Sequence, residues 1–177
     1  MNGRVYLVVL GIVLAATAML SAEQSVRIVP IVSDRTVLVS TEITDAYSDE
    51  IRQEIASGLR TTFSYDIELR VVVPGWVDRT IATATVTTSD QYDNLTRRHT
   101  LSRLVDGRVE DSSVTDDDAV VRRWLTTLSR VPLCNTSKLD AARDYYVRVT
   151  ARAKPRGTSI IGWATTVVGQ ARFTFIP

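Results

Sequence analysis

His99 is the only histidine in the 177-residue sequence, and it is the side chain best suited to general acid–base chemistry near neutral pH. A Ser–His–Asp triad would need this imidazole to accept a proton from a serine. No nucleophile-elbow motif surrounds any serine in the sequence. The neighbouring Arg97 and Arg98 oppose the protonated form of the imidazole. We therefore expect His99 to be a partly exposed strand residue, and we expect the protein not to be an enzyme.

Metal ligands and cofactor motifs are scarce. One histidine and one cysteine cannot supply the nitrogen and sulfur ligands of a zinc site. The run Asp116–Asp118 offers oxygen ligands, but a calcium loop alternates its ligands and needs a glycine and a distal acid, so we expect these aspartates to cap a helix. Glycine-rich phosphate loops are absent, and we expect no cofactor. A carboxylate pair for glycoside cleavage stays open, because any Asp and Glu can meet in a fold.

Arginines and tryptophans are the remaining candidates for binding. The second half of the chain is rich in arginine, which suits either a solvated face or docking to an anionic surface such as lipid headgroups or acidic glycans. Two tryptophans stand near turns, where an aromatic side chain either anchors a partner or covers the core. The candidate partner-binding residues are Trp76, Arg97, Arg98, Arg122, Arg123 and Trp163.

Residues 1–22 have the layout of a secretory signal peptide. Arg4 supplies the positive charge, an apolar run follows, and Ala18 and Ala22 offer small residues for cleavage. The apolar run is shorter than the roughly 20 residues of a membrane-spanning helix, although an uncleaved N-terminal anchor is the alternative. We expect an exported protein that is periplasmic, or membrane-anchored and facing the periplasm.

Residues 23–177 are predicted to form a single β-rich globular domain. The formal net charge of +1 gives no global attraction to nucleic acid. Cys134 is the only cysteine, so it cannot close a disulfide within the chain. We expect it to be a small buried apolar residue, with an intermolecular bridge or a reactive thiol as the alternatives.

Alternating and β-branched runs predict most of the strands. Val26–Ser33 and Thr36–Ile43 are typical of a hairpin, and Phe63–Val73 alternates strictly between apolar and polar residues. Gln91–Asn94 is predicted to turn the chain, and Tyr145–Ala153 alternates again. The expected fold class is α+β: an antiparallel β-sheet or β-sandwich of about seven strands, with two short amphipathic helices packed on it.

The first helix is predicted to begin at Ser48, which is a suitable N-cap. Ile51, Ile55 and Leu59 recur at four-residue spacing and form one apolar stripe. The helix leads directly into the strand that begins near Phe63, so we expect this stripe to bury against the apolar face of that strand.

The second helix is predicted to begin at Thr115, with Asp118 in the capping-box position. Val121, Trp124, Leu125 and Leu128 occupy one face, Arg130 suits the C-terminal end, and Pro132 is expected to stop the helix.

Several turns, caps and strand patterns together carry a family resemblance. These are Thr36–Thr44, Ser48–Arg52, Ser57–Leu59, Thr62–Phe63, Arg70–Val71, Asp78–Arg79, Val105–Gly107, the helix around Trp124, and Tyr146–Val149. In these stretches the chain resembles the DUF4390 family of exported bacterial proteins of unknown function, and it departs from the pattern in Gly162–Gln170. The resemblance implies an envelope protein, encoded in some bacteria near a membrane sensor kinase, which hints at signalling; it supplies no catalytic residues.

These observations favour a non-enzymatic exported envelope module that binds a protein partner such as a membrane sensor. The alternative is a carrier of a small ligand or lipid, in which the inner face of Phe63–Val73 would be the wall of an apolar cavity.

Overall fold

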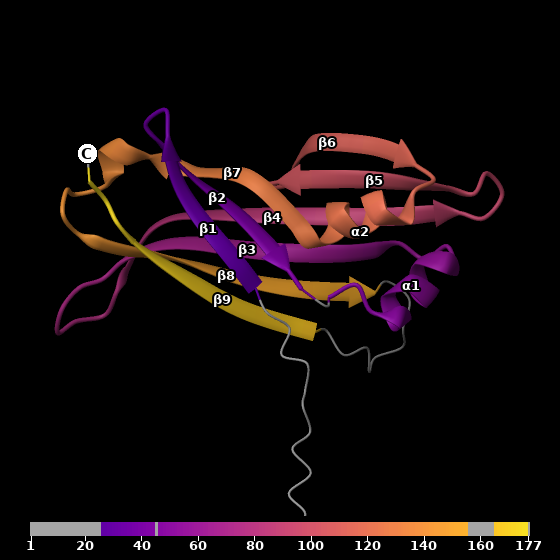
Figure 1. Ribbon diagram of the computed structural model, residues 1–177, viewed down its shortest axis with the longest axis horizontal. Coiled ribbons are helices and arrows are strands. Elements are labelled where there is room, and N and C mark those ends of the chain that lie inside the picture. Colours follow the sequence, from indigo (N-terminus) through magenta and orange to yellow (C-terminus); the bar gives the residue numbers. More distant parts are fainter. Residues whose placement is uncertain (1–25, 45, 156–164, 177) are drawn as a thin grey trace, which may run out of the picture.

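The computed structural model describes residues 26–44, 46–155 and 165–176, which form two antiparallel sheets and two α-helices (Figure 1). The elements are β1 (Val26–Ser33), β2 (Thr36–Ile43), α1 (Asp49–Ala56), β3 (Thr61–Val71), β4 (Arg79–Asp93), β5 (Arg98–Val105), β6 (Arg108–Thr115), α2 (Asp118–Thr126), β7 (Thr127–Asn135), the 3-10 turn η1 (Thr136–Lys138), β8 (Asp144–Pro155) and β9 (Thr165–Thr174). The smaller sheet has the order β1-β2-β7, and the larger has the order β6-β5-β4-β3-β8-β9. The smaller sheet and α2 lie over one face of the larger sheet, which confirms the α+β prediction.

The core lies between these layers, and β3 is its main contributor. Side chains of β3 alternate strictly between buried and half-buried positions, as its sequence predicted. Because β3 pairs with both β4 and β8, its inward side chains have neighbours on each side. Val37 and Val39 of β2 and Leu125 of α2 are fully buried in the same cluster. The face that a carrier would use as its cavity wall is thus occupied by core packing from Phe63 to Val71.

The β1–β2 hairpin forms as predicted. Asp34 and Arg35 both adopt positive φ, at 51° and 59°, which matches the backbone of a two-residue hairpin turn. Pro30 lies in β1, which is an edge strand of the smaller sheet. A proline is tolerated at such an edge because its missing N–H removes no bond from the interior of the sheet.

The second helix is shorter than predicted, and the sequence pattern missed strand β7. The N-cap is Asp117 and not Thr115, because the Asp117 carboxylate accepts a hydrogen bond from the Ala119 N–H at 2.8 Å. The helix ends at Thr126, and Pro132 lies in β7 opposite Leu38. Two register shifts interrupt the pairing of β2 with β7, and β7 is an edge strand, so the proline fits there.

Arg130, which was predicted to end that helix, lies in β7 with a positive φ of 54°. The Arg130 N–H donates to the Ser40 hydroxyl at 3.0 Å, next to one of the register shifts. Leu128 is fully buried, as its apolar spacing suggested, but it reaches the core from a strand and not from a helix. Pairing with β2 therefore outweighed the local helical pattern.

The predicted turn at Gln91–Asn94 is displaced toward the C-terminus. Strand β4 continues to Asp93, where it pairs with Arg98 of β5. The Asp93 carboxylate accepts bonds from the Leu95 N–H at 2.9 Å and from the Thr96 hydroxyl at 2.8 Å. These side-chain bonds fix the turn at residues 94–97, since aspartate readily organises the backbone that follows it.

Two further features bear on the predictions. Cys134 is buried beside the core and forms no disulfide, and burial raises the pKa of its thiol. In the described part of the chain, no helix is long and apolar enough to cross a membrane.

Candidate functional site

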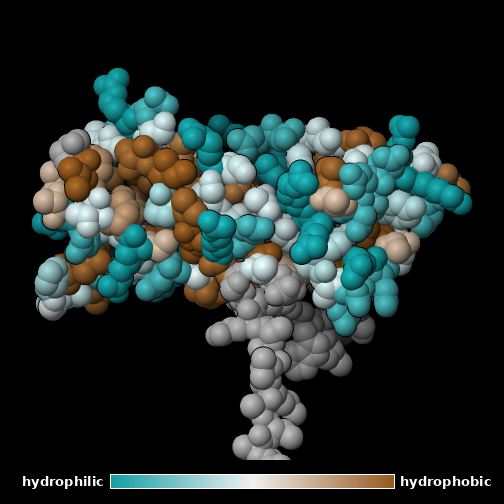
Figure 2. Space-filling view, in the orientation of Figure 1, coloured by the Kyte–Doolittle hydropathy of each residue, from teal (hydrophilic) through white to brown (hydrophobic). Residues whose placement is uncertain are grey.

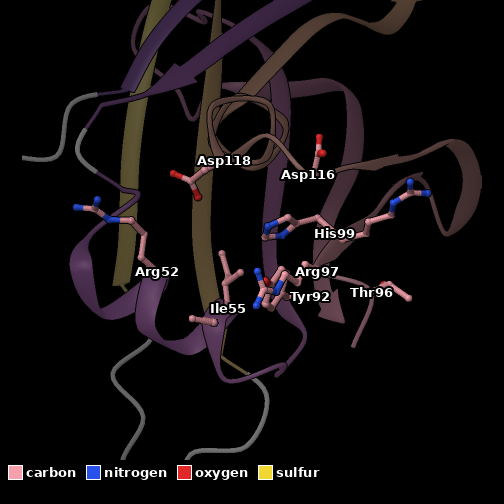
Figure 3. Close-up of a pocket in the computed structure, with 10 residues that line it drawn as sticks. Arg52, Ile55, Tyr92, Thr96, Arg97, His99, Asp116 and Asp118 are labelled. Carbon is pink, nitrogen blue, oxygen red and sulfur yellow. The ribbon is translucent and has the colours of Figure 1, made fainter. Parts of the chain in front are cut away.

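A pocket of about 610 Å³ opens where α1, the β4–β5 turn and the N-terminus of α2 meet (Figure 3). Charged and polar side chains from these three elements form most of its lining, and Ile55 contributes an apolar wall. The lining residues are Arg52, Ile55, Ala56, Tyr92, Thr96, Arg97, Arg98, His99, Asp116 and Asp118.

His99 forms one side of the pocket. We predicted that its side chain would be partly exposed, but it is buried. Its Nδ1 lies 2.9 Å from Oδ2 of Asp90, which is completely buried. The reason is strand parity, because His99 pairs with Tyr92 while Leu101 pairs with Asp90, so all four side chains share the inner face of the sheet. The His99 and Tyr92 rings are 4.6 Å apart, measured between centroids. The imidazole is therefore surrounded by Asp90 and Tyr92 as well as by the neighbouring Arg97 and Arg98.

The surroundings of Asp90 disfavour the ionised form of its carboxyl group. Burial raises the pKa of its carboxyl, and the hydrogen bond with His99 opposes that rise. Its second oxygen, Oδ1, has no hydrogen-bond partner among the described residues. When Asp90 is ionised, His99 Nδ1 must carry the proton that joins the two groups, which leaves Nε2 as the other polar atom of the ring.

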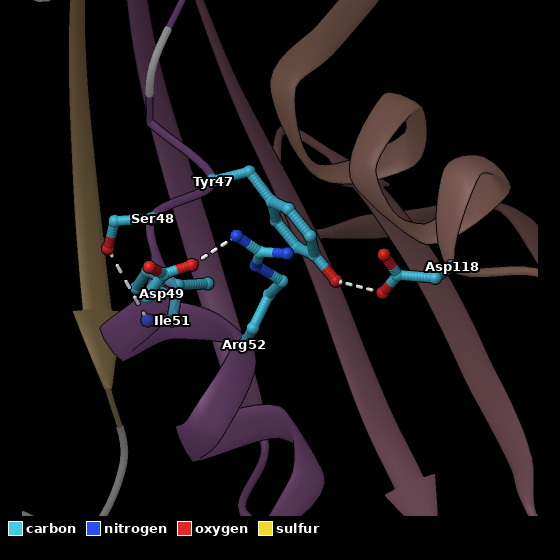
Figure 4. Close-up of polar contacts among 6 residues, drawn as sticks. All are labelled: Tyr47, Ser48, Asp49, Ile51, Arg52 and Asp118. Atoms are coloured by element: carbon cyan, nitrogen blue, oxygen red, sulfur yellow. Dashed lines mark hydrogen bonds and ion pairs between the residues drawn. The ribbon is translucent and has the colours of Figure 1, made fainter.

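Tyr47 connects the two helices at the rim of the pocket (Figure 4). Its hydroxyl donates to Oδ1 of Asp118 at 2.6 Å, so the segment before α1 is tied to the first residue of α2. Burial and this bond raise the pKa of the Tyr47 hydroxyl. Ser48 caps α1 by accepting from the Ile51 N–H, as predicted, and Arg52 forms an ion pair with Asp49.

Three charged side chains at the pocket are not neutralised by a neighbour. Among the described residues, neither Arg97 nor Arg98 forms an ion pair or a side-chain hydrogen bond, and the Asp116 carboxylate also lacks both. Arg97 adopts a positive φ of 55° at the end of the β4–β5 turn, with its N–H bonded to the Asp93 carbonyl at 2.8 Å. The end of the turn and the start of β5 therefore place two guanidinium groups without ion-pair partners among the described residues at the pocket, an arrangement that suits a carboxylate or another anionic group.

Only part of the predicted apolar stripe of α1 packs against the core beside this pocket. Ile55 is buried and Ile51 is half-buried against the core, which agrees with the prediction. Leu59 is 39% exposed, which corrects the prediction that it buries against the sheet. The helix ends at Ala56, and Gly58 follows with a φ of 82°, so Leu59 leaves the helical face.

We expect Ile55→Ala to lower the free energy of unfolding by about 2–3 kcal/mol, because it removes a buried side chain between α1 and the sheet. Gln53→Ala on the exposed side of the same helix is the matched control, with an expected effect within roughly 0.5 kcal/mol. Urea denaturation of the two variants measures the difference. Equal midpoints would show that α1 is peripheral to the fold.

The other predicted binding residues lie elsewhere. Arg122 and Arg123 are exposed on α2 and do not line the pocket. Trp76 is exposed in the β3–β4 connection, at the opposite end of the strands. Trp163 lies outside the described residues. Of the predicted binding residues, Arg97 and Arg98 line the pocket, and Asp90 was missed because the turn was expected to begin beside it.

A family model for a domain of unknown function, DUF4390, matches residues 23–156. The chain belongs to the DUF4390 family. This confirms the resemblance, and the matched range contains the whole lining of the pocket. No curated protein and no solved structure matches the chain. The DUF4390 match brings no catalytic residue with it, and no group of three potential ligands for a metal ion occurs among the described residues.

Proposed function

We propose that this DUF4390 protein is an exported, non-enzymatic envelope module that binds a protein partner, such as a membrane sensor, through the pocket beside His99. The observation that carries the proposal is the pair of guanidinium groups without ion-pair partners among the described residues, Arg97 on the β4–β5 turn and Arg98 at the start of β5, in the lining of that pocket. Arginine forms two parallel hydrogen bonds with a carboxylate, so an acidic side chain or chain terminus of the partner fits this rim.

The pocket contains charges of both signs, which favours a peptide over a simple anion. Asp116 lies in the same lining as Arg97, and it too is without an ion-pair partner among the described residues. A segment of a partner that carries both an acidic and a basic group would satisfy both sides of the pocket. The half-buried Tyr92 adds aromatic surface that a partner side chain can cover.

The chemistry of the lining supports binding over catalysis. Thr96 is the only aliphatic hydroxyl in the lining, and it already donates to the Asp93 carboxylate. His99 has its Nδ1 paired with Asp90 and has no serine or cysteine beside it in the lining. Nucleophilic catalysis needs such a group within hydrogen-bond reach of the base.

Site-specific photo-crosslinking in intact envelopes tests the proposal. A photoreactive amino acid in place of Thr96 is expected to give a covalent adduct with one envelope protein, because this position lies at the pocket. The same group in place of Val109 is the control, since Val109 is exposed on β6 and is not part of the pocket lining. Recovery of only uncrosslinked protein from both positions, in envelopes where a known complex is captured, would count decisively against partner binding.

A further inference from the structure

The end of the sandwich opposite the pocket carries large apolar side chains on the tips of separate loops. Trp76 is 82% exposed and Val77 is 75% exposed in the β3–β4 connection, and Ile176 near the C-terminus is 81% exposed. Val32 beside the β1–β2 turn is also exposed. Hydrophobic surface gathers at this end in Figure 2, on the left, where Figure 1 places the C-terminus and the β1–β2 turn.

Backbone hydrogen bonds hold these loops together at one end. The Thr136 N–H donates to the Arg35 carbonyl at 2.8 Å, which joins the β1–β2 turn to the β7–β8 connection. That connection is joined in turn to the C-terminal segment, because the Ala142 N–H donates to the Phe175 carbonyl at 3.0 Å. The β3–β4 connection joins the same group through the Val72 N–H, which donates to the Asp144 carbonyl at 3.0 Å.

The turn that carries Trp76 is braced at its base by Asp78. The Asp78 carboxylate accepts from the Val73 N–H at 3.2 Å and from the Tyr146 hydroxyl at 2.9 Å. Arg70 donates to the Asp78 carbonyl at 2.9 Å, and the Trp76 N–H donates to the Val73 carbonyl at 3.1 Å. The tryptophan is thus held out in solvent by an ordered loop, so little conformational entropy is lost when it is buried in a binding partner.

Positive charge surrounds these apolar tips. The four aspartates at this end accept hydrogen bonds or pair within the protein, whereas four exposed cations have no ion-pair partner among the described residues. These cations are Arg35, Arg79, Lys138 and Arg172. The aspartates keep their charge when they accept hydrogen bonds from hydroxyl or N–H groups. With Arg143, five cations stand against the four aspartates Asp34, Asp78, Asp140 and Asp144, so this end carries a small net positive charge that complements an anionic surface.

We propose that this end docks on an anionic lipid bilayer, with Trp76 and Val77 entering the interfacial layer and the four cations contacting lipid headgroups. Tryptophan favours the boundary between headgroups and acyl chains, and basic residues near it add attraction to anionic lipids. Exposed apolar tips together with exposed cations suit the interfacial layer of a bilayer, where apolar side chains enter the acyl boundary and basic residues meet anionic headgroups. This inference does not depend on the partner proposed for the pocket, which lies at the other end of the strands.

Fluorescence of the full-length chain reconstituted in vesicles tests the docking. An environment-sensitive dye is attached at Val77→Cys or at Leu95→Cys, each with Cys134→Ser so that only one thiol reacts. Leu95 is the matched control, because it is an exposed apolar residue on the turn at the pocket end. The vesicles contain either phosphatidylcholine alone or phosphatidylcholine with phosphatidylglycerol, and nitroxide-labelled lipids report contact.

The dye at position 77 is expected to shift to shorter wavelength and to be quenched several-fold more strongly than the dye at position 95, in anionic vesicles only. Arg79→Gln with Arg172→Gln is expected to weaken that quenching, and raised salt is expected to do the same. Equal, water-like emission from both positions in anionic vesicles would overturn the proposal. A shift at position 77 that needs added envelope proteins and not lipid alone would also overturn it, and would assign this end to a protein partner.

Discussion

The His99→Ala variant is expected to lose about 3–5 kcal/mol of unfolding free energy at neutral pH. His99 is the hydrogen-bond partner of Asp90, and one oxygen of that buried carboxylate is already without a partner among the described residues. Removing the imidazole takes away the side-chain hydrogen bond of a fully buried carboxylate, which costs more than removing both partners together. Urea denaturation at neutral pH measures the loss.

The pH dependence of this loss separates a stranded charge from a simple cavity. Because burial raises the pKa of Asp90 above its ordinary 3.8, the folded protein takes up the proton before the unfolded chain does. The penalty for the ionised carboxylate is therefore present at neutral pH and is relieved as pH falls through the raised pKa toward 3.8. We expect the deficit of His99→Ala to shrink in that direction. The double variant His99→Ala with Asp90→Ala should lose less than the sum of the single losses. A deficit that is constant with pH, together with additive losses, would contradict the charge account.

The Tyr65→Ala variant is expected to lose about 3–5 kcal/mol, because Tyr65 is the largest completely buried side chain on the inner face of β3. Its hydroxyl also donates to the Leu125 carbonyl near the C-terminal end of α2. The variant therefore creates a cavity beneath α2 and removes the bond that fixes its last turn. Chemical denaturation measures the stability, and far-ultraviolet circular dichroism follows the helix.

Tyr65→Phe is the matched control, since it keeps the ring and removes only the hydroxyl. The Thr88 hydroxyl also donates to the Leu125 carbonyl, at 3.3 Å, so this carbonyl keeps one donor in the Phe variant. We expect a loss of about 1 kcal/mol, the usual net value of one such hydrogen bond. A Phe variant as unstable as the Ala variant would mean that the hydroxyl, and not the packing of the ring, anchors α2 to the sheet.

The sequence predicted the elements whose side chains alternate over many residues. β3 and β8 carry long alternating runs, and both are interior strands of the larger sheet, so local pattern and tertiary structure agree. β7 was missed because its apolar Leu128 continues the spacing of α2 and Pro132 resembles a helix stop. Only the long-range pairing with β2 shows that this segment is a strand, and local periodicity contains no information about that pairing.

Some residues of the candidate site could be chosen from the sequence, but the pairs that they form could not. Arg97 and Arg98 were selected from the basic charge of the second half of the chain, a choice that needs no knowledge of partners in space, and both line the pocket. The Asp90–His99 pair required the correct register of β4 on β5. A turn predicted three residues too early takes Tyr92 out of the strand, and with it the Tyr92–His99 pairing that places His99 on the same face as Asp90. Tyr47 and Asp118 are 71 residues apart, and no sequence spacing brings them together.

The most direct test of the proposed function compares two arginine pairs in the photo-crosslinking experiment at Thr96. Arg97→Ala with Arg98→Ala removes the free guanidinium groups at the pocket, whereas Arg122→Ala with Arg123→Ala removes two exposed arginines from α2 outside the lining. Charge-assisted hydrogen bonds of about 1.5–3 kcal/mol each predict that the first change lowers the adduct yield at least about ten-fold. The second change is expected to leave the yield within about two-fold, because rim charges far from a bound group contribute little. Equal yields from the two double variants would contradict recognition through this pocket.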